Sequence, residues 1–219
     1  MKALVFVLIV LFCMSNILFS QTGIDEKTVA LLEEISNGAE KVILARPIEN
    51  GYRADIQVFS RSGDVWQKLH HTEGYFGRNG VTGDKMEGDG ATPSGVFTFG
   101  RAFGMVYDPG SLLSYTKVTD NDVWVDDVNS RFYNQWSYLD NPEADWDSAE
   151  HLIKYPNEYK YVLTINYNTD PIIIGKGSAI FLHCSSDRPT AGCISVSEAT
   201  MIFLLGFVDS ETIIGIFQN

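Results

Sequence analysis

The first regular pattern along the chain is an amphipathic one near the N-terminus. Between residues 24 and 36 the apolar side chains of Val29, Leu31, Leu32 and Ile35 are set among Glu and Lys. At this spacing apolar side chains share one face of an α-helix. We therefore predict a short helix here, packed on the outside of the domain.

From Lys41 onward the pattern changes to short apolar segments typical of β-strands. Arg61-Ser62-Gly63-Asp64 favours a hairpin turn, and Thr92-Pro93-Ser94-Gly95 marks another turn that leads into a strand. The predicted strands cover residues 42–45, 54–60, 65–69, 96–99, 123–125, 161–167, 179–183 and 212–217.

A second helix is predicted near the C-terminus. Ser195-Val196-Ser197-Glu198 has the form of a capping box, and the helix that it opens would extend to about Phe207. Strands dominate, no βαβ alternation appears and no internal repeat is visible. We therefore expect a mainly β domain with peripheral helices, of the α+β class, built on a mixed or antiparallel sheet.

The N-terminus has the layout of a secretory signal peptide. One lysine is followed by an apolar run over residues 3–14, which is too short to span a membrane. We expect cleavage after Ser20, export to the periplasm or cell envelope, and no membrane span in the mature chain. A lipoprotein alternative at Cys13 is disfavoured because the bulky Phe12 precedes that cysteine.

Length and charge narrow the class of protein further. Without residues 1–20 the chain is still long enough for one sizeable core, so we expect a signal peptide at 1–20, an N-terminal helical segment at 21–40 and one domain at 41–219. The net charge of the full chain is −12. Such an acidic chain without clustered Lys and Arg is a poor binder of nucleic acid. An anionic substrate would need a local cationic pocket.

The most informative chemistry is the pair formed by His183 and Cys193. A thiol with a pKa of ~8.5 is mostly protonated at neutral pH, and a nearby imidazole can remove that proton. Gly192 allows close backbone approach, so N–H groups near Cys193 can face a developing oxyanion. The dipole of the helix predicted after Cys193 would also lower the pKa of that thiol. These are the parts of a covalent acyl-transfer site, in which the second ring nitrogen of His183 should donate to a carbonyl or carboxylate.

Two other uses of these side chains remain open on sequence grounds. A Cys184–Cys193 disulfide is the ordinary expectation for two cysteines in an exported protein, and it would consume the nucleophile. A zinc site built from His183, Cys184 and Cys193 is disfavoured, because adjacent His and Cys do not easily reach one ion and no fourth ligand is evident.

Four segments resemble motifs of the YkuD-type L,D-transpeptidases, cysteine enzymes that cross-link peptidoglycan stem peptides. They lie in the family's order between about residues 74 and 205. The segments are Lys85-Met86-Glu87-Gly88-Asp89-Gly90-Ala91-Thr92-Pro93-Ser94-Gly95-Val96-Phe97; Trp124-Val125-Asp126-Asp127 with Ser130 and Tyr133-Asn134; Ile165-Asn166-Tyr167-Asn168 with the run from Gly175 to His183; and His183 to Cys193, including Thr190-Ala191-Gly192-Cys193-Ile194.

The resemblance implies an L,D-transpeptidase-type β-sandwich or mixed sheet, with residues 41–219 as the catalytic domain. It implies that His183 deprotonates Cys193, which attacks the third residue of a donor tetrapeptide and expels D-alanine. An amine of an acceptor stem peptide then takes the acyl group. Backbone N–H groups of Gly192 and Cys193 would form the oxyanion hole, and neither a metal nor an organic cofactor is implied.

The substrate contacts are less well defined by the resemblance. Many family members carry a histidine two positions before the cysteine and an arginine two positions after it, where this chain has Ala191 and Ser195. The branch with the Glu-Gly-Asp-Gly segment commonly lacks both residues, so their absence does not indicate an inactive enzyme. The candidate substrate-binding residues are Glu87, Asp89, Thr92, Lys176, Arg188 and Thr190.

Several alternatives remain open. The loop with Glu87, Asp89 and Thr92 would be a plain surface turn on composition alone. The aromatic side chains of Trp124, Tyr133 and Trp136 either belong to the core or line the cleft. The activity would be that of an L,D-carboxypeptidase if water resolved the thioester, and a non-catalytic cell-wall-binding module is the alternative from another class.

Overall fold

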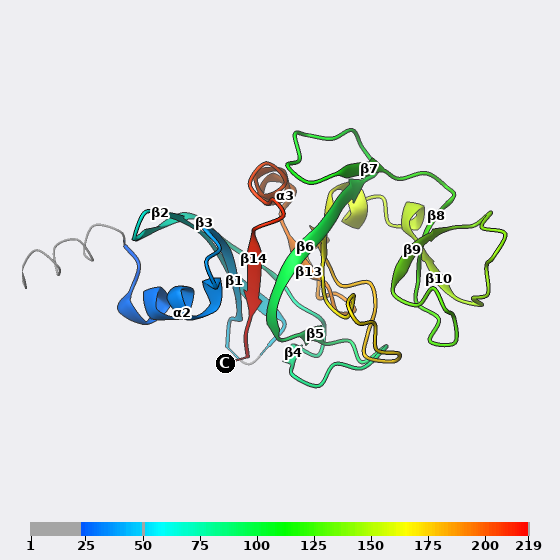
Figure 1. The fold of residues 1–219 in the computed structure, drawn as a ribbon, viewed down its shortest axis with the longest axis horizontal. Coiled ribbons are helices and arrows are strands. Elements are labelled where there is room, and N and C mark those ends of the chain that lie inside the picture. The colour runs from blue at the N-terminus through cyan, green and yellow to red at the C-terminus, as the bar shows by residue number, and fades with distance from the viewer. Residues whose placement is uncertain (1–22, 50, 219) are drawn as a thin grey trace, which may run out of the picture.

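The computed structural model describes residues 23–49 and 51–218, so the predicted signal peptide lies outside the described residues. The first described helix, α2 (Glu26–Ser36), matches the predicted amphipathic segment. Asp25 caps it, because its Oδ1 accepts a hydrogen bond of 2.9 Å from the Thr28 N–H group. Its buried Leu32 packs with Val42 and Trp66 beside the sheet. Figure 1 shows α2 at one end of the molecule.

The main sheet has nine strands in the order β11-β12-β13-β3-β2-β1-β14-β6-β7. β11 also pairs with β6, so the sheet closes on itself. It is mixed, because β1–β14, β12–β13 and β6–β7 are parallel pairs whereas the other pairs are antiparallel. The nine strands are β1 (Lys41–Pro47), β2 (Arg53–Ser62), β3 (Val65–Tyr75), β6 (Gly95–Gly104), β7 (Tyr115–Lys117), β11 (Val162–Ile165), β12 (Phe181–Cys184), β13 (Ile194–Val196) and β14 (Ile213–Ile216).

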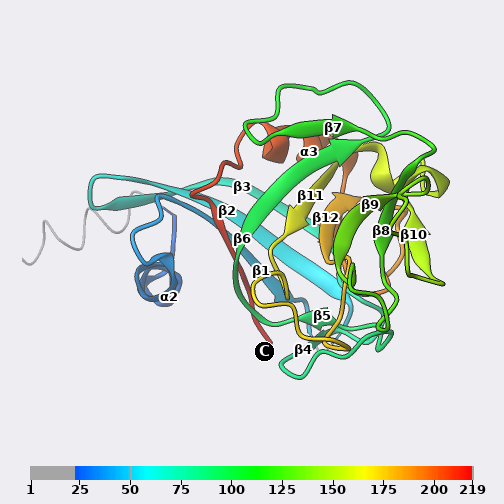
Figure 2. The same ribbon diagram turned by 45° about the vertical axis from the view of Figure 1, so that its right-hand side comes forward.

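The largest hydrophobic core lies among these strands and is completed by the helix α3 (Glu198–Leu205). Met201, Leu204 and Leu205 of α3 are fully buried there. Figure 2 shows α3 beside the curved sheet, near the end of β6. This buried packing explains the apolar side chains on the face of α3 toward the sheet, whereas Ile202 is exposed.

The start of α3 differs from the predicted capping box. Ser195 lies on strand β13, and Ser197 is the N-cap, with its hydroxyl accepting a hydrogen bond of 3.2 Å from the Thr200 N–H group. Ser195 is not available as a cap because its backbone is held between β12 and β3. The helix also ends at Leu205, two residues before the predicted limit.

A second, three-stranded sheet forms a separate lobe in the order β10-β8-β9. Its strands are β8 (Asp122–Val125), β9 (Gln135–Tyr138) and β10 (Ala149–His151), followed by the 3₁₀ turns η1 (Leu152–Lys154) and η2 (Glu158–Lys160). Figure 1 shows this lobe at the end of the molecule opposite α2. Trp124 and Tyr159 of the lobe pack against Phe103 and Phe181 of the main sheet, which fixes the lobe beside β12.

Several strand limits differ from the predictions. β3 extends to Tyr75, six residues beyond the predicted strand. The prediction stopped at residue 69 because most side chains of β3 face solvent and show no apolar alternation. β11 ends at Ile165 rather than at residue 167, since the Tyr167 N–H group bonds to the Ile165 carbonyl in a tight turn. The short strands β7, β9 and β10 and the pair β4 (Val81–Thr82) and β5 (Thr92–Pro93) were not predicted. Within the described part of the chain, no helix is long and apolar enough to cross a membrane.

Candidate active site

Cys193 lies directly before β13 and directly after Gly192, and its carbonyl oxygen is held by two threonine hydroxyls. Thr190 Oγ1 donates to this oxygen at 2.6 Å and Thr92 Oγ1 at 3.3 Å. Gly192 has a φ of 156°, and a Cβ atom there would lie 3.1 Å from the Ala91 carbonyl oxygen. The backbone around the thiol is therefore tightly fixed, and glycine fits this position because it has no side chain.

The Cys193 sulfur is buried and makes two hydrogen bonds to the backbone. Sγ donates to the Ala179 carbonyl oxygen at 3.2 Å and accepts from the Phe181 N–H group at 3.4 Å. Cys184 is also a free thiol, so the two cysteines do not form the disulfide. They belong to different hydrophobic clusters, with Cys184 in the main core and Cys193 beside the lobe.

His183 occupies β12 and is also buried, and its orientation is fixed by the backbone. Its Nδ1 atom lies 2.7 Å from the Cys184 carbonyl oxygen, which can only accept, so Nδ1 carries the proton and donates. Nε2 is therefore the unprotonated atom in the neutral ring. The Tyr159 ring packs edge-on against the imidazole, with 5.6 Å between ring centroids. The partner expected for the second ring nitrogen is thus a main-chain carbonyl.

Burial favours the uncharged forms of both groups. Burial lowers the pKa of His183 to about 4. It raises the pKa of Cys193 to about 12, and the negative charge of Glu150 contributes to this increase. The expected help from the α3 dipole is not realised, since strand β13 separates Cys193 from the helix. At rest the site therefore contains a neutral thiol and a neutral imidazole.

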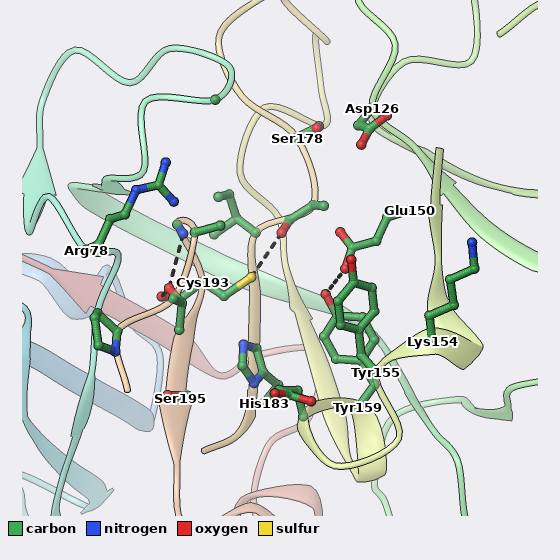
Figure 3. Close-up of a pocket in the computed structure, with 18 of the residues that line it drawn as sticks. Arg78, Asp126, Glu150, Lys154, Tyr155, Tyr159, Ser178, His183, Cys193 and Ser195 are labelled. Atoms are coloured by element: carbon green, nitrogen blue, oxygen red, sulfur yellow. Dashed lines mark hydrogen bonds between the residues drawn. The ribbon is translucent and has the colours of Figure 1, made fainter. Parts of the chain in front are cut away.

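Both groups line one cavity of about 650 Å³ between the main sheet and the lobe. Figure 3 shows Cys193 near its centre, with Arg78 on one side, Glu150, Tyr155 and Tyr159 on the other, and His183 below. The cavity thus brings together side chains from β10, β12, η2 and the segment before β13. An imidazole with a free Nε2 and a thiol in one cavity can perform nucleophilic acyl transfer.

Three of the predicted substrate-binding residues line this cavity: Glu87, Arg188 and Thr190. Glu87 accepts a hydrogen bond of 2.5 Å from the Tyr133 hydroxyl, and Arg188 forms an ion pair of 3.0 Å with Glu158. Thr190 reaches the cavity but uses its hydroxyl to hold the Cys193 carbonyl.

The structure does not place the other three in the cavity lining. Asp89 forms an ion pair of 2.6 Å with Lys85, which is buried beside Gly192. Thr92 is fully buried beneath the Cys193 backbone, and Lys176 pairs at the surface with Asp84 at 2.9 Å. Asp89 and Thr92 therefore shape the backbone of the site rather than its open surface.

The aromatic residues of the second motif are part of the protein interior. Trp124 and Tyr133 are buried, and the Trp124 indole donates to Asn134 Oδ1 at 3.0 Å. Neither ring lines the cavity.

Sequence reasoning missed much of the cavity lining, including Arg78, Lys85, Glu150 and Tyr159. The signal available for Lys85 was its position in the motif that contains Glu87 and Asp89. Glu150 and Tyr159 had no such signal, because they approach Cys193 only through packing of the lobe against β12. Within the described ranges, no group of three or more His, Cys, Asp or Glu side chains is arranged to hold a metal ion.

Comparison with known proteins identifies one family. Residues 65–216 match the family model described as the L,D-transpeptidase catalytic domain, YkuD. A search of curated proteins gives no match.

Solved structures with a similar chain path include Bd1075 of Bdellovibrio bacteriovorus, with 18% identity, 82% of this chain and 48% of that chain covered, and a TM-score of 0.43. L,D-transpeptidase 1 of Mycobacterium tuberculosis has 15% identity, coverages of 83% and 63%, and a TM-score of 0.37. An L,D-transpeptidase from Mycobacterium smegmatis has 13% identity, coverages of 82% and 59%, and a TM-score of 0.37. The chain therefore spans less than two thirds of the length of each of these proteins.

Proposed function

Because the chain belongs to the L,D-transpeptidase catalytic domain family, whose model matches more than two thirds of it, we propose that it is an exported cysteine L,D-transpeptidase acting on peptidoglycan stem peptides. The observation that carries the proposal is the shared cavity of Cys193 and His183, in which the imidazole keeps Nε2 free as a proton acceptor.

In the proposed first step, His183 Nε2 takes the thiol proton as the Cys193 sulfur attacks the carbonyl carbon of the third residue of a donor tetrapeptide. A C–S bond forms and the C–N bond to D-alanine breaks. The imidazolium returns the proton to the leaving amine. Because burial disfavours both charged forms before substrate arrives, proton transfer accompanies the attack instead of preceding it.

The carbonyl oxygen becomes negatively charged during this step and needs a hydrogen-bond donor. The Gly192 N–H group already donates to Thr190 Oγ1 at 3.1 Å. The Cys193 N–H group makes no hydrogen bond within the described residues. We therefore assign the oxyanion to the Cys193 N–H group, with Gly192 allowing the close approach of substrate.

The cavity also carries positive charge, which an anionic stem peptide requires in a protein of net charge −12. Arg78 and Arg188 both line it. Arg188 is 73% exposed at its side chain and shares its charge with Glu158. We propose that these two guanidinium groups hold carboxylates of the donor.

The test is incubation of the mature protein with defined muropeptides, followed by mass spectrometry. Wild-type protein should give cross-linked dimers, and Cys193→Ala should give none. Cys184→Ala is the matched control, because that thiol lies outside the cavity and its loss should leave the product pattern unchanged. Shortened monomers alone would indicate an L,D-carboxypeptidase, and no product from wild-type protein would support a wall-binding module.

A further inference from the structure

One carboxylic acid in the cavity has no role in the acylation step described above. Glu150 lies on β10 of the small lobe and faces the cavity that contains Cys193. Figure 3 shows its carboxyl group directed inward, on the side of Cys193 opposite to Arg78. Its negative charge contributes to the raised pKa of the Cys193 thiol, so the two groups are within electrostatic range of each other.

Among the acids that line the cavity, Glu150 is the one whose charge acts on the Cys193 thiol, and like Glu87 and Asp126 it has no ion pair within the described residues. Glu158, in contrast, has the Arg188 guanidinium. One carboxylate oxygen of Glu150, Oε1, accepts a hydrogen bond from the Tyr159 hydroxyl, which holds the side chain in place. Oε2 is left for another donor.

The electrostatic surroundings favour arrival of a cation beside Glu150. Burial raises the pKa of Glu150 to about 7, with a smaller contribution from the charges of Asp126 and Glu87 and against the lowering effect of the Tyr159 hydrogen bond. A partly buried carboxylate without a cationic partner is stabilised by a positively charged ligand. Water brings no such compensation, so the site favours an ammonium group as the incoming acyl acceptor.

An incoming ammonium group finds no opposite charge on His183, because burial keeps that ring neutral and lowers its pKa to about 4. The Glu150 carboxylate does offer an opposite charge, from the side of Cys193 opposite to Arg78 (Figure 3). Of the two groups, Glu150 is therefore the better placed to bind the ammonium group.

On the basis of the proposed function, we propose that Glu150 is a catalytic residue of the second step. Glu150 binds the ammonium group of an amine acceptor and removes one of its protons. The acceptor class is a primary alkylamine, and the Tyr159 hydroxyl holds the Glu150 carboxylate toward it.

The proton balance of the step is complete. The acceptor ammonium passes one proton to Glu150, and its nitrogen then attacks the thioester carbonyl carbon. The new C–N bond forms and the C–S bond to Cys193 breaks. The departing thiolate takes the second proton from nitrogen, leaving an amide and the neutral thiol, and protonated Glu150 releases its proton to solvent through the open cavity.

The test separates the two steps in the Glu150→Gln variant of the mature protein. The thioester is formed with a tetrapeptide donor and measured by intact mass, and the acyl-enzyme is then partitioned between a primary alkylamine acceptor and hydroxylamine, which is uncharged at neutral pH. We expect thioester formation within about threefold of wild type and transfer to the alkylamine reduced about 100-fold, the range for loss of a general base. Transfer to hydroxylamine should fall by less than about tenfold, because that nucleophile needs no deprotonation before attack.

Glu143→Gln is the matched control, since Glu143 is an exposed acid of the same lobe that pairs with Arg131 away from the cavity. Equal loss with both nucleophiles, or transfer to the alkylamine at the wild-type rate, overturns the inference while leaving the proposed function intact. Failure of the variant to form a thioester also overturns it, because Glu150 would then serve acylation or the fold. Absence of a thioester in wild-type protein refutes the proposed function, and the inference falls with it.

Discussion

The Nδ1 atom of His183 lies 2.7 Å from the carbonyl oxygen of Cys184, the residue that follows it. This contact sets the ring tautomer without using a carboxylate, and it directs the basic lone pair of Nε2 away from the backbone. The hydrogen bond to this uncharged carbonyl and the charge of Glu158 only partly offset the cost of burying a positive charge on the ring. The neutral resting state of the His183 and Cys193 pair follows from this arrangement.

Protein stability should therefore depend on pH through His183. Its folded pKa, about 4, lies below the value of 6.5 in the unfolded chain. Below pH 6.5 the unfolded state binds a proton that the folded state refuses, so stability falls as pH decreases. The loss contributed by His183 should approach roughly 3 kcal/mol between pH 7 and pH 4. Urea unfolding of wild type and His183→Gln across this range measures it, and parallel curves for the two proteins would refute the assignment.

The rate at which Cys193 is alkylated should show that its thiol is uncharged at neutral pH. With its pKa raised to about 12 by burial, the free thiol should react slowly with iodoacetamide at neutral pH. The rate should keep rising between about pH 7 and pH 10, where a thiol with a pKa of ~8.5 would reach a plateau. Cys193→Ala protein gives the background from Cys184. A plateau near neutral pH would mean that a thiolate exists before substrate binds.

The Ser195 hydroxyl is expected to lower the free energy of unfolding of the free protein. Its hydroxyl is buried and has no hydrogen-bond partner among the described residues. Ser195→Ala should therefore unfold with an equal or higher free energy than wild type, by up to about 1–3 kcal/mol. Ser137 is a matched buried serine whose hydroxyl accepts from Asn141 at 3.0 Å, and Ser137→Ala should lose about 1 kcal/mol. A loss of similar size in both variants would show that Ser195 has a partner.

Thr92 is expected to hold the backbone of the site in place through hydrogen bonds, without contact with substrate. Its hydroxyl accepts a hydrogen bond of 2.8 Å from the Gly77 N–H group and donates to the Cys193 carbonyl. Thr92→Val leaves that buried N–H group unpaired and should cost about 1–3 kcal/mol of unfolding free energy. Thr72→Val, which removes a hydroxyl bonded to the adjacent Glu73 carbonyl, serves as the control. Unchanged stability in Thr92→Val, with a weaker binding of substrate, would instead favour a direct contact.

Local patterns predicted the elements whose contacts are close in sequence. The amphipathic spacing gave helix α2, and the Gly63-Asp64 turn gave the hairpin of β2 and β3. The mixed sheet agrees with the expected mainly β class. The closure of the sheet through β11 and β6 was not predictable from periodicity, because it depends on pairing between distant segments.

The site residues also fall into two groups, those predicted from local sequence and those placed by tertiary packing. His183 and Cys193 were apparent from residue type and spacing, and the structure places both in one cavity. Composition could not separate residues that face the cavity, such as Glu87, from those that brace its backbone, such as Asp89 and Thr92. No sequence pattern indicated that Glu150 belongs to the site, because its approach to Cys193 depends on how the lobe packs against the main sheet.

The central claim, that Cys193 attacks with His183 as its base, is tested most directly by mapping the acyl-enzyme. The mature protein is mixed with a tetrapeptide donor, quenched in acid, digested and analysed by mass spectrometry. We predict an adduct on Cys193 in wild type and formation of that adduct at least about 100-fold more slowly in His183→Gln. An adduct on Cys184, or one that forms equally fast in both proteins, would contradict the account.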